Sequence, residues 1–194
     1  MSRIVICRHG NTFDTGEVVT RVGARTDLAL SESGRIQAET LRETLSQFDF
    51  TKAYCSPLTR TRQTATAIIN SQTPLEILEF LTEIDYGPDE NSPEVEVVAR
   101  LGQDIIDLWD LKAIPPKGWI IDVEGVIKSW RAFFELHRYS EEDILVVTSN
   151  GIARFVLDTL EVLPNEVPRK LRTAAFGLIN LTAEKTELLY WDKR

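Results

Sequence analysis

An apolar run near the start of the chain leads directly into a cation and an imidazole. Residues 4–7 read Ile-Val-Ile-Cys, and Arg8, His9 and Gly10 follow at once. A short apolar run that ends at a glycine predicts a buried strand, and ligands of α/β proteins bind beyond the carboxyl ends of parallel strands. We therefore expect an α/β fold in which His9 stands at the reactive edge of the sheet and Gly10 lets the backbone turn beside it.

Strand and helix patterns alternate along most of the chain. Ser31 is placed to cap a helix that opens at residues 30–32, with Glu32 in its first turn. The other predicted strands are 52–56, 75–81, 143–148, 176–181 and 188–191, and the other predicted helices are 58–70, 93–111, 123–138 and 152–160. This order predicts a three-layer α/β/α sandwich with a mostly parallel central sheet, closed by a terminal hairpin.

The chain has the size and composition of one domain. Its 194 residues are 43% hydrophobic, and a chain of roughly 150–200 residues buries about 70% of the surface that its unfolded form exposes. Repeats and low-complexity tracts are absent from the sequence. We expect a single domain over residues 1–194, in which residues 85–118 form an insertion or lid over the strand ends.

Charge and composition exclude several classes of function. A formal net charge of −8 disfavours nucleic acid or an anionic membrane as the main partner. Apolar runs fall far short of the roughly 20 residues of a membrane span, and the first run is too short for a signal peptide, so we expect a cytoplasmic protein. Cys7 and Cys55 are expected to be reduced and buried. Without a His/Cys cluster or a recognisable ligand spacing, neither a metal nor a cofactor is expected.

Several blocks resemble one known family in their order along the chain. Residues 8–12 read Arg-His-Gly-Asn-Thr, residues 30–38 and 56–65 look like that family's first two helices, and Glu83 precedes Asp-Tyr-Gly. Residues 146–154 join a buried strand to a turn and an arginine. Together these blocks resemble the histidine phosphatase superfamily, also called phosphoglycerate mutase-like, over essentially the whole chain.

The resemblance implies a role for each matching residue. His9 would be the nucleophile that takes a phosphoryl group on a ring nitrogen, and it must be neutral to attack. Arg8 and Arg60 would bind the phosphate oxygens, since a guanidinium donates paired, charge-assisted hydrogen bonds. Glu83 would protonate the leaving oxygen and later deprotonate the attacking water. Arg62 is expected to be an ordinary solvated surface residue.

One expected residue of the family pattern is absent. The family normally has a second histidine in a His-Gly-Gly-like turn, five positions before an arginine, and counting back from Arg154 places Ser149 there. Asn150 and Gly151 follow, so the turn is kept and the imidazole is lost. The only other histidine, His137, precedes the strand, and a strand of about five residues spans roughly 16 Å. We therefore expect His137 at the opposite edge of the sheet and reject it as a substitute.

The cost of this replacement can be bounded. Exchanging a charged hydrogen-bond donor for a neutral one loses on the order of 1–2 kcal/mol, or about 5- to 30-fold in rate. Losing the donor altogether costs roughly 100- to 1000-fold. Ser149 or Asn150 could still donate a neutral hydrogen bond to the phosphate. We therefore expect a weakened or specialised phosphatase rather than an inactive protein.

Three functions follow from these residues. The first is a phosphomonoester hydrolase, a histidine-type acid phosphatase that works through a phosphohistidine at His9. The second is a pseudoenzyme that binds a small phosphorylated metabolite or a phosphoprotein through Arg8 and Arg60 without turning it over. The third is a phosphoglycerate mutase, which the short chain and the weakly matching residues 89–123 disfavour. Substrate identity and oligomeric state lie beyond the sequence.

Two further features concern the segment over the strand ends. Glu90 stands where members of the family often have a second acidic residue, but Asn91 replaces the glycine that usually follows, so the conformation of the lid is left open. Trp109, Trp119 and Trp130 are interpreted as packing residues, because aromatic residues at helical spacing usually belong to a core.

Overall fold

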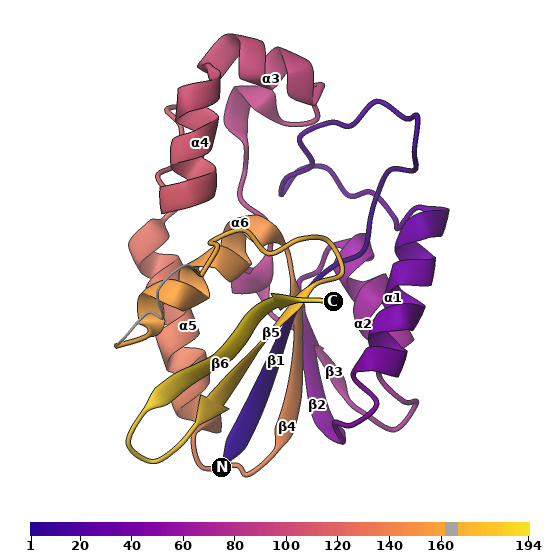
Figure 1. Cartoon of the computed structure of the whole chain (residues 1–194), viewed down its shortest axis with the longest axis vertical. Coiled ribbons are helices and arrows are strands. Elements are labelled where there is room, and N and C mark those ends of the chain that lie inside the picture. Colours follow the sequence, from indigo (N-terminus) through magenta and orange to yellow (C-terminus); the bar gives the residue numbers. More distant parts are fainter. Residues whose placement is uncertain (162–166) are drawn as a thin grey trace.

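The computed structural model describes residues 1–161 and 167–194 and has a six-stranded sheet at its centre, in the order β3-β2-β4-β1-β5-β6 (Figure 1). The strands are β1 (Ser2–Arg8), β2 (Phe50–Cys55), β3 (Leu75–Ile77), β4 (Asp143–Thr148), β5 (Phe176–Leu181) and β6 (Thr186–Lys193). The first four strands run parallel, whereas β5 is antiparallel to β1 and to β6. The mostly parallel sheet and the terminal hairpin are confirmed.

Helices cover both faces of this sheet. They are α1 (Glu32–Thr44), α2 (Thr59–Ile68), α3 (Glu94–Leu101), α4 (Gln103–Lys112), α5 (Val123–His137) and α6 (Asn150–Ala153), with 3₁₀ turns η1 (Glu79–Leu81), η2 (Gly87–Asp89) and η3 (Arg154–Thr159). In Figure 1, α1 and α2 lie on one side of the sheet and α5 and α6 on the other. The predicted α/β/α arrangement is therefore confirmed.

The inner strands are apolar because both of their faces are covered. Along β1, Val5 and Cys7 pack in the core cluster that includes residues of α1 and α2. Ile4 and Ile6 point the other way, into the cluster that includes the aromatic side chains of α5. A strand that is buried on both faces needs a continuous apolar run, and this is the pattern of residues 4–7.

The start of α1 matches its prediction and explains a neighbouring glycine. Ser31 caps the helix by accepting a hydrogen bond from the backbone N–H of Gly34 at 3.2 Å. A Cβ atom on Gly10 would lie 2.4 Å from the carbonyl oxygen of Gly34. Gly10 is therefore needed because the loop after β1 touches the first turn of α1, a different reason from the turn that the sequence suggested.

Three predicted elements differ from the structure. The strand expected over residues 75–81 ends at Ile77, because β2, its partner, ends at Cys55; Leu81 then enters the core with no exposed surface. The helix expected over residues 93–111 is divided at Gly102, whose φ of 89° lies outside the helical region.

The third difference concerns the turn after β4. Residues 149–151 were expected to precede a helix over residues 152–160, but the helical turn begins earlier. Ser149 O accepts backbone hydrogen bonds from Ile152 at 3.2 Å and from Ala153 at 2.9 Å, so α6 starts at Asn150. From Arg154 onward the chain forms the 3₁₀ turn η3.

Buried side chains agree with the predictions for tryptophan and cysteine. Trp109, Trp119 and Trp130 all lie in the aromatic core cluster, so the packing interpretation is confirmed. Cys7 and Cys55 are both buried free thiols, and burial raises the pKa of Cys55 to about 11. Among the described residues, no helix combines the length and the hydropathy needed to cross a bilayer.

Two segments rise above the carboxyl ends of the strands (Figure 1). One contains α3 and α4, within the region predicted as a lid, and the other is the loop over residues 11–29. The loop contacts the segment with α3 and α4 where Thr20 pairs with Pro93. At the base of that segment, its two ends are linked by the pairing of Asp85 with Ile120. The site at the strand ends is therefore walled by these two segments.

Candidate active site

His9 lies where two parallel strands end together. Arg8 of β1 is in register with Thr148 of β4, and the backbone N–H of His9 donates to Thr148 O at 3.1 Å. The side chain of His9 is buried, at 6% exposure. This contact brings the residues after β1 and the residues after β4 to one place, at the carboxyl ends of two parallel strands.

The hydrogen bonds of the imidazole assign its tautomer. Nδ1 lies 2.7 Å from the carbonyl oxygen of Gly10, which can only accept, so Nδ1 carries the proton. Nε2 in turn accepts a hydrogen bond from Nε of Arg60 at 3.2 Å. Burial, together with the positive charges of Arg60 and Arg8, holds the pKa of His9 well below 6.5. Nε2 therefore carries a lone pair at neutral pH, as a nucleophile requires.

Arg60 reaches His9 from the first turn of α2. The guanidinium has no exposed surface, and it donates from Nη1 to Thr26 O at 2.9 Å and from Nη2 to Gly23 O at 3.2 Å. Burial lowers the pKa of Arg60, but an arginine in a protein stays charged. Arg60 therefore places a permanent cation beside Nε2 and binds the loop over residues 11–29 to α2. Arg62, by contrast, is exposed as predicted.

Arg8, the last residue of β1, is held by the segment before β5. Its Nη1 donates to Leu171 O at 3.0 Å, and its Nε is buried without a partner among the described residues. Burial lowers the pKa of Arg8, and the nearby charge of Glu83 opposes this shift. The side chain as a whole is only half-buried, so its guanidinium can also donate to an anionic ligand.

Glu83 is fixed against the turn after β4. Its Oε1 accepts from the backbone N–H of Ile84 at 2.9 Å, and its Oε2 accepts from that of Gly151 at 3.2 Å. A Cβ atom on Gly151 would lie 2.0 Å from Oε1, so only glycine allows this approach. The carboxyl group has acceptor sites left for a ligand, because each of its oxygens has two lone pairs.

A cavity of about 430 Å³ is lined by three of the predicted residues, whereas Arg60 and Ser149 are not part of its wall. Arg8, His9 and Glu83 are all part of its wall. The remaining wall residues are Asn11, Thr12, Phe13, Val19, Thr20, Arg21, Val22, Tyr86, Glu94, Trp109, Asp110, Asn150, Lys170 and Thr173. Many come from the loop over residues 11–29, which has no helical or strand pattern. Apart from Asn11 and Thr12, which belong to the block at residues 8–12, these loop residues gave no signal in the sequence.

The outer cations of this cavity are already paired. Lys170 Nζ lies 2.9 Å from a carboxylate oxygen of Asp110, and Arg21 donates to the carboxylate of Glu94. The guanidinium of Arg21 also lies over the ring of Tyr86 at 5.4 Å. The outer wall therefore presents no unpaired cation from these two residues.

Ser149 and Asn150 lie differently with respect to the cavity. Ser149 is fully buried, it is absent from the cavity wall, and its Oγ has no hydrogen-bond partner in the part of the chain that the structure describes. Asn150 is part of the wall. The sequence contained a signal for Asn150, because it belongs to the turn after β4 in which Ser149 or Asn150 could donate a neutral hydrogen bond.

Glu90 is not part of the cavity wall and instead stabilises the loop over residues 11–29. Its Oε1 accepts from the backbone N–H groups of Gly23 and Arg25, both at 3.0 Å, and from Thr26 Oγ1 at 2.7 Å. It thereby orders the same turn whose carbonyl groups accept from Arg60. Asn91 adopts a φ of 57°, in the left-handed region that asparagine tolerates better than most residues, so it serves where glycine was expected.

His137 is distant from these groups in the fold. It is 3% exposed, it ends α5, and its ring packs against Phe133 and Tyr54 with centroids 4.7 and 5.3 Å away. It is not part of the cavity wall, in agreement with its rejection as a substitute. Among residues 1–161 and 167–194, no group of three or more His, Cys, Asp and Glu side chains could hold a metal ion.

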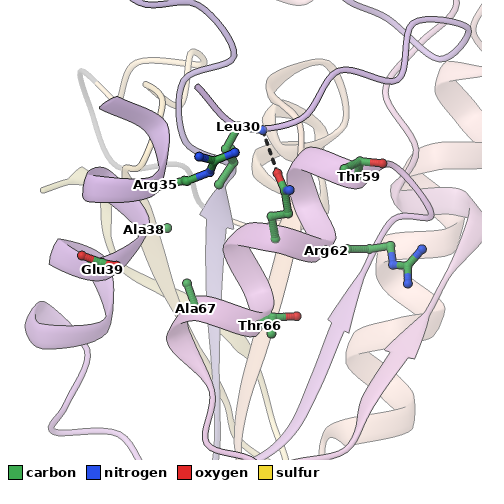
Figure 2. A pocket seen from close by; sticks show the side chains of 9 residues that line it. Leu30, Arg35, Ala38, Glu39, Thr59, Arg62, Thr66 and Ala67 are labelled. Carbon is green, nitrogen blue, oxygen red and sulfur yellow. Dashed lines mark hydrogen bonds between the residues drawn. The ribbon is translucent and has the colours of Figure 1, made fainter. Parts of the chain in front are cut away.

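A second hollow, of about 590 Å³, lies between α1 and α2 (Figure 2). Gln63 bridges its two sides by accepting from the backbone N–H of Leu30 at 2.7 Å. Arg35 and Arg62 line it together with Ala38 and other small or polar residues, but no histidine does. The groups that could carry out a proton or group transfer therefore meet in the first cavity.

Comparisons with known proteins find one family over almost the whole chain and solved structures of the same fold. The family described as "Histidine phosphatase superfamily (branch 1)" matches residues 4–193. A protein of Gloeobacter violaceus named 2,3-bisphosphoglycerate-dependent phosphoglycerate mutase 2 is 27% identical over 180 residues, 88% of this chain and 81% of that protein. Among solved structures, a mycobacterial glucosyl-3-phosphoglycerate phosphatase complexed with VO3 has a TM-score of 0.80 at 20% identity over 99% of both chains. The alpha-ribazole phosphatase of Shigella flexneri has a TM-score of 0.74 at 20% identity, covering 98% of this chain and 96% of that one.

Proposed function

The chain belongs to the histidine phosphatase superfamily, branch 1, and on this premise we propose that it hydrolyses phosphomonoesters through a phosphohistidine at His9. One observation carries the proposal: Nε2 of His9 is free of a proton, accepts from Arg60, and shares a cavity with Arg8 and Glu83. This set contains a nucleophile, two cations for a phosphate, and a carboxyl group for proton transfer.

The first step transfers the phosphoryl group to the protein. Nε2 of His9 attacks phosphorus in line with the ester bond, and the bond between phosphorus and the leaving oxygen breaks as the new N–P bond forms. Glu83, in its carboxylic acid form, gives its proton to the leaving oxygen, so an alcohol departs. Arg8 and Arg60 stabilise the charge on the phosphoryl oxygens.

The second step restores the protein. Glu83, now a carboxylate, takes a proton from a water molecule whose oxygen attacks the phosphorus. The N–P bond breaks, phosphate leaves, and His9 returns to its neutral form. The cycle needs no other reactant than the ester and water.

Ser149 stands, in this proposal, at the position of the family's second imidazole. Its buried and unpartnered hydroxyl provides no positive charge, so the transferring phosphoryl group is held by fewer cations than in a member with two histidines. A weakened rate follows, by about 5- to 30-fold if a neutral donor replaces the charged one.

The cavity favours a small substrate whose leaving group is neutral. A volume of about 430 Å³ is typical of a small-molecule site. Lys170 and Arg21 are both paired with carboxylates, so a second phosphate or a carboxylate on the substrate would have to break one of these pairs. This argues against a phosphoglycerate mutase, the activity named for the relative from Gloeobacter violaceus, even though that relative spans most of the chain.

Hydrolysis of an aryl phosphate between about pH 5 and 8 tests the proposal. Wild type should turn over the ester, and His9→Ala should abolish turnover. Because the chain has only two histidines, peptide mapping after acid-free quenching assigns any phosphohistidine to His9 or to His137. A gain of rate in Ser149→His would show that the missing imidazole limits the reaction.

The binding-only alternative predicts a different result. A pseudoenzyme would bind phosphate or vanadate saturably through Arg8 and Arg60, yet release no alcohol from the aryl phosphate. The lack of an imidazole at Ser149 favours this alternative, and Glu83 opposes it, because a pure binder has no use for a carboxyl group in the cavity wall that includes the nucleophile.

A further inference from the structure

Ser149 does not offer its hydroxyl to the cavity. The residue has no exposed surface, its Oγ has no partner in the described part of the chain, and the cavity wall does not include it. Its backbone carbonyl accepts the first hydrogen bonds of α6. If a neutral donor serves the phosphate from this turn, another residue must supply it.

Asn150, the next residue, does reach the cavity. Its Oδ1 accepts from the backbone N–H of Leu171 at 2.8 Å, and since an N–H can only donate, this contact assigns the two ends of the amide. The Nδ2 end has no acceptor among residues 1–161 and 167–194, and it is not one of the buried side-chain atoms that lack a partner there. Asn150 is thus part of the cavity wall and has an NH₂ group without an acceptor in the described part of the chain.

Arg8 and Asn150 are held by the same peptide segment. The carbonyl oxygen of Leu171 accepts from Nη1 of Arg8 at 3.0 Å, while the N–H of Leu171 donates to Asn150. Both side chains are part of the wall that includes His9. One buried residue, Leu171, thus holds two side chains that both line the cavity.

We propose that Nδ2 of Asn150 donates a neutral hydrogen bond to the phosphoryl group as it moves onto His9, and that Asn150, rather than Ser149, takes over part of the role of the missing imidazole. The inference rests on the proposed function, because the reacting phosphoryl group is the acceptor. An amide donor does not titrate between pH 5 and 8, so it keeps its protons wherever His9 is neutral. An oriented amide donor of this kind typically contributes about 10²- to 10³-fold to a rate.

Two substitutions of Asn150 separate donation from positioning. Asn150→Asp keeps an oxygen for the N–H of Leu171 but replaces the NH₂ donor with a charged acceptor oxygen, whereas Asn150→Ala removes the donor without adding a charge. Both should lower kcat for an aryl phosphate by roughly 100-fold or more and weaken vanadate binding, with little change in melting temperature. If only Asn150→Ala loses rate, Asn150 merely positions Leu171, and the proposal fails.

Ser149→Ala provides the direct comparison. The proposal expects a smaller loss in kcat from Ser149→Ala than from Asn150→Ala; an equal or larger loss would overturn it. The experiment also distinguishes this inference from the proposed function. If wild type has no turnover, the proposed function fails, and the vanadate affinities of the variants alone decide whether Asn150 binds the oxyanion.

Discussion

Arg60 donates a hydrogen bond from Nε to Nε2 of His9 across 3.2 Å, although neither side chain is more than 6% exposed. The contact places a permanent positive charge against the one ring atom that can attack phosphorus. Beside this charge, and in a buried position, protonation of the imidazole to its cationic form is disfavoured. A phosphate that reaches Nε2 can accept the same N–H, so nucleophile and phosphate binding are built into one pair of residues.

Replacing Arg60 by lysine should therefore impair both activity and stability. A lysine has no planar fork and cannot serve Thr26 O, Gly23 O and a phosphate together. We expect kcat/KM for an aryl phosphate to fall about 100-fold or more and the free energy of unfolding to fall by about 1–3 kcal/mol. Arg62→Lys, on the same helix but exposed, is the matched control and should resemble wild type. Equal losses in the two variants would refute this role.

The protonation of His9 can be followed directly. Its pKa lies well below 6.5 because of burial and the charges of Arg60 and Arg8, so the ring should stay neutral from pH 8 down to pH 6.5. In Arg60→Gln one of these charges is gone, and the pKa should rise. Imidazole NMR in a chain with two histidines measures both values, and His9→Ala assigns the signals. A His9 that titrates at 6.5 or above in wild type would contradict the assignment.

Gly151 should be required for proton transfer by Glu83. A methyl group on Gly151 would lie 2.0 Å from Oε1, so Gly151→Ala should displace the carboxyl group. Because Glu83 protonates the leaving oxygen, we expect larger losses with a poor leaving group, an alkyl phosphate, than with 4-nitrophenyl phosphate. Glu83→Gln should have the same dependence on the leaving group. A uniform loss across esters would instead indicate that Gly151→Ala disturbs the fold.

His137 should make stability depend on pH without affecting catalysis. Burial, and then the charge of Lys52, lowers its pKa in the folded chain, whereas the unfolded chain binds the proton near pH 6.5. The unfolded state therefore holds more protons below that pH, and the free energy of unfolding falls as pH decreases, by up to about 1.4 kcal/mol per pH unit for each such histidine. In denaturant unfolding measured between pH 7.5 and 5.5, the free energy of unfolding should change less with pH in His137→Phe than in wild type. Loss of turnover in this variant would contradict its separation from the site.

The paired cations of the outer wall predict a substrate preference. Wild type should hydrolyse glycerol phosphate with a higher kcat/KM than 3-phosphoglycerate, because Lys170 and Arg21 are occupied by carboxylates. Asp110→Asn frees Lys170. It should raise kcat/KM for 3-phosphoglycerate, relative to that for glycerol phosphate, by about 2- to 5-fold, which corresponds to the free energy of one exposed ion pair. A wild-type preference for the anionic substrate would favour the mutase function instead.

Local patterns were sufficient for most of the fold. The apolar run at residues 4–7, the cap at Ser31 and the alternation of strands and helices each depend on residues close in sequence, and the structure confirms them. Where neighbours in space decided the outcome, the prediction was wrong. The strand expected to continue to Leu81 stops because β2 ends, and the glycine at residue 10 is needed because Gly34 lies against it.

The sequence by itself determined the order of elements and pointed to His9, Arg8, Arg60 and Glu83, since each belongs to a short block whose spacing can be read along the chain. Only the tertiary structure decided which other groups meet them. Asn150 faces the cavity because Leu171, 21 positions away, holds its amide, and Lys170 is neutralised by Asp110 from 60 positions away. Such contacts depend on how separate segments pack at the strand ends, and packing between distant segments leaves no periodic pattern in a sequence.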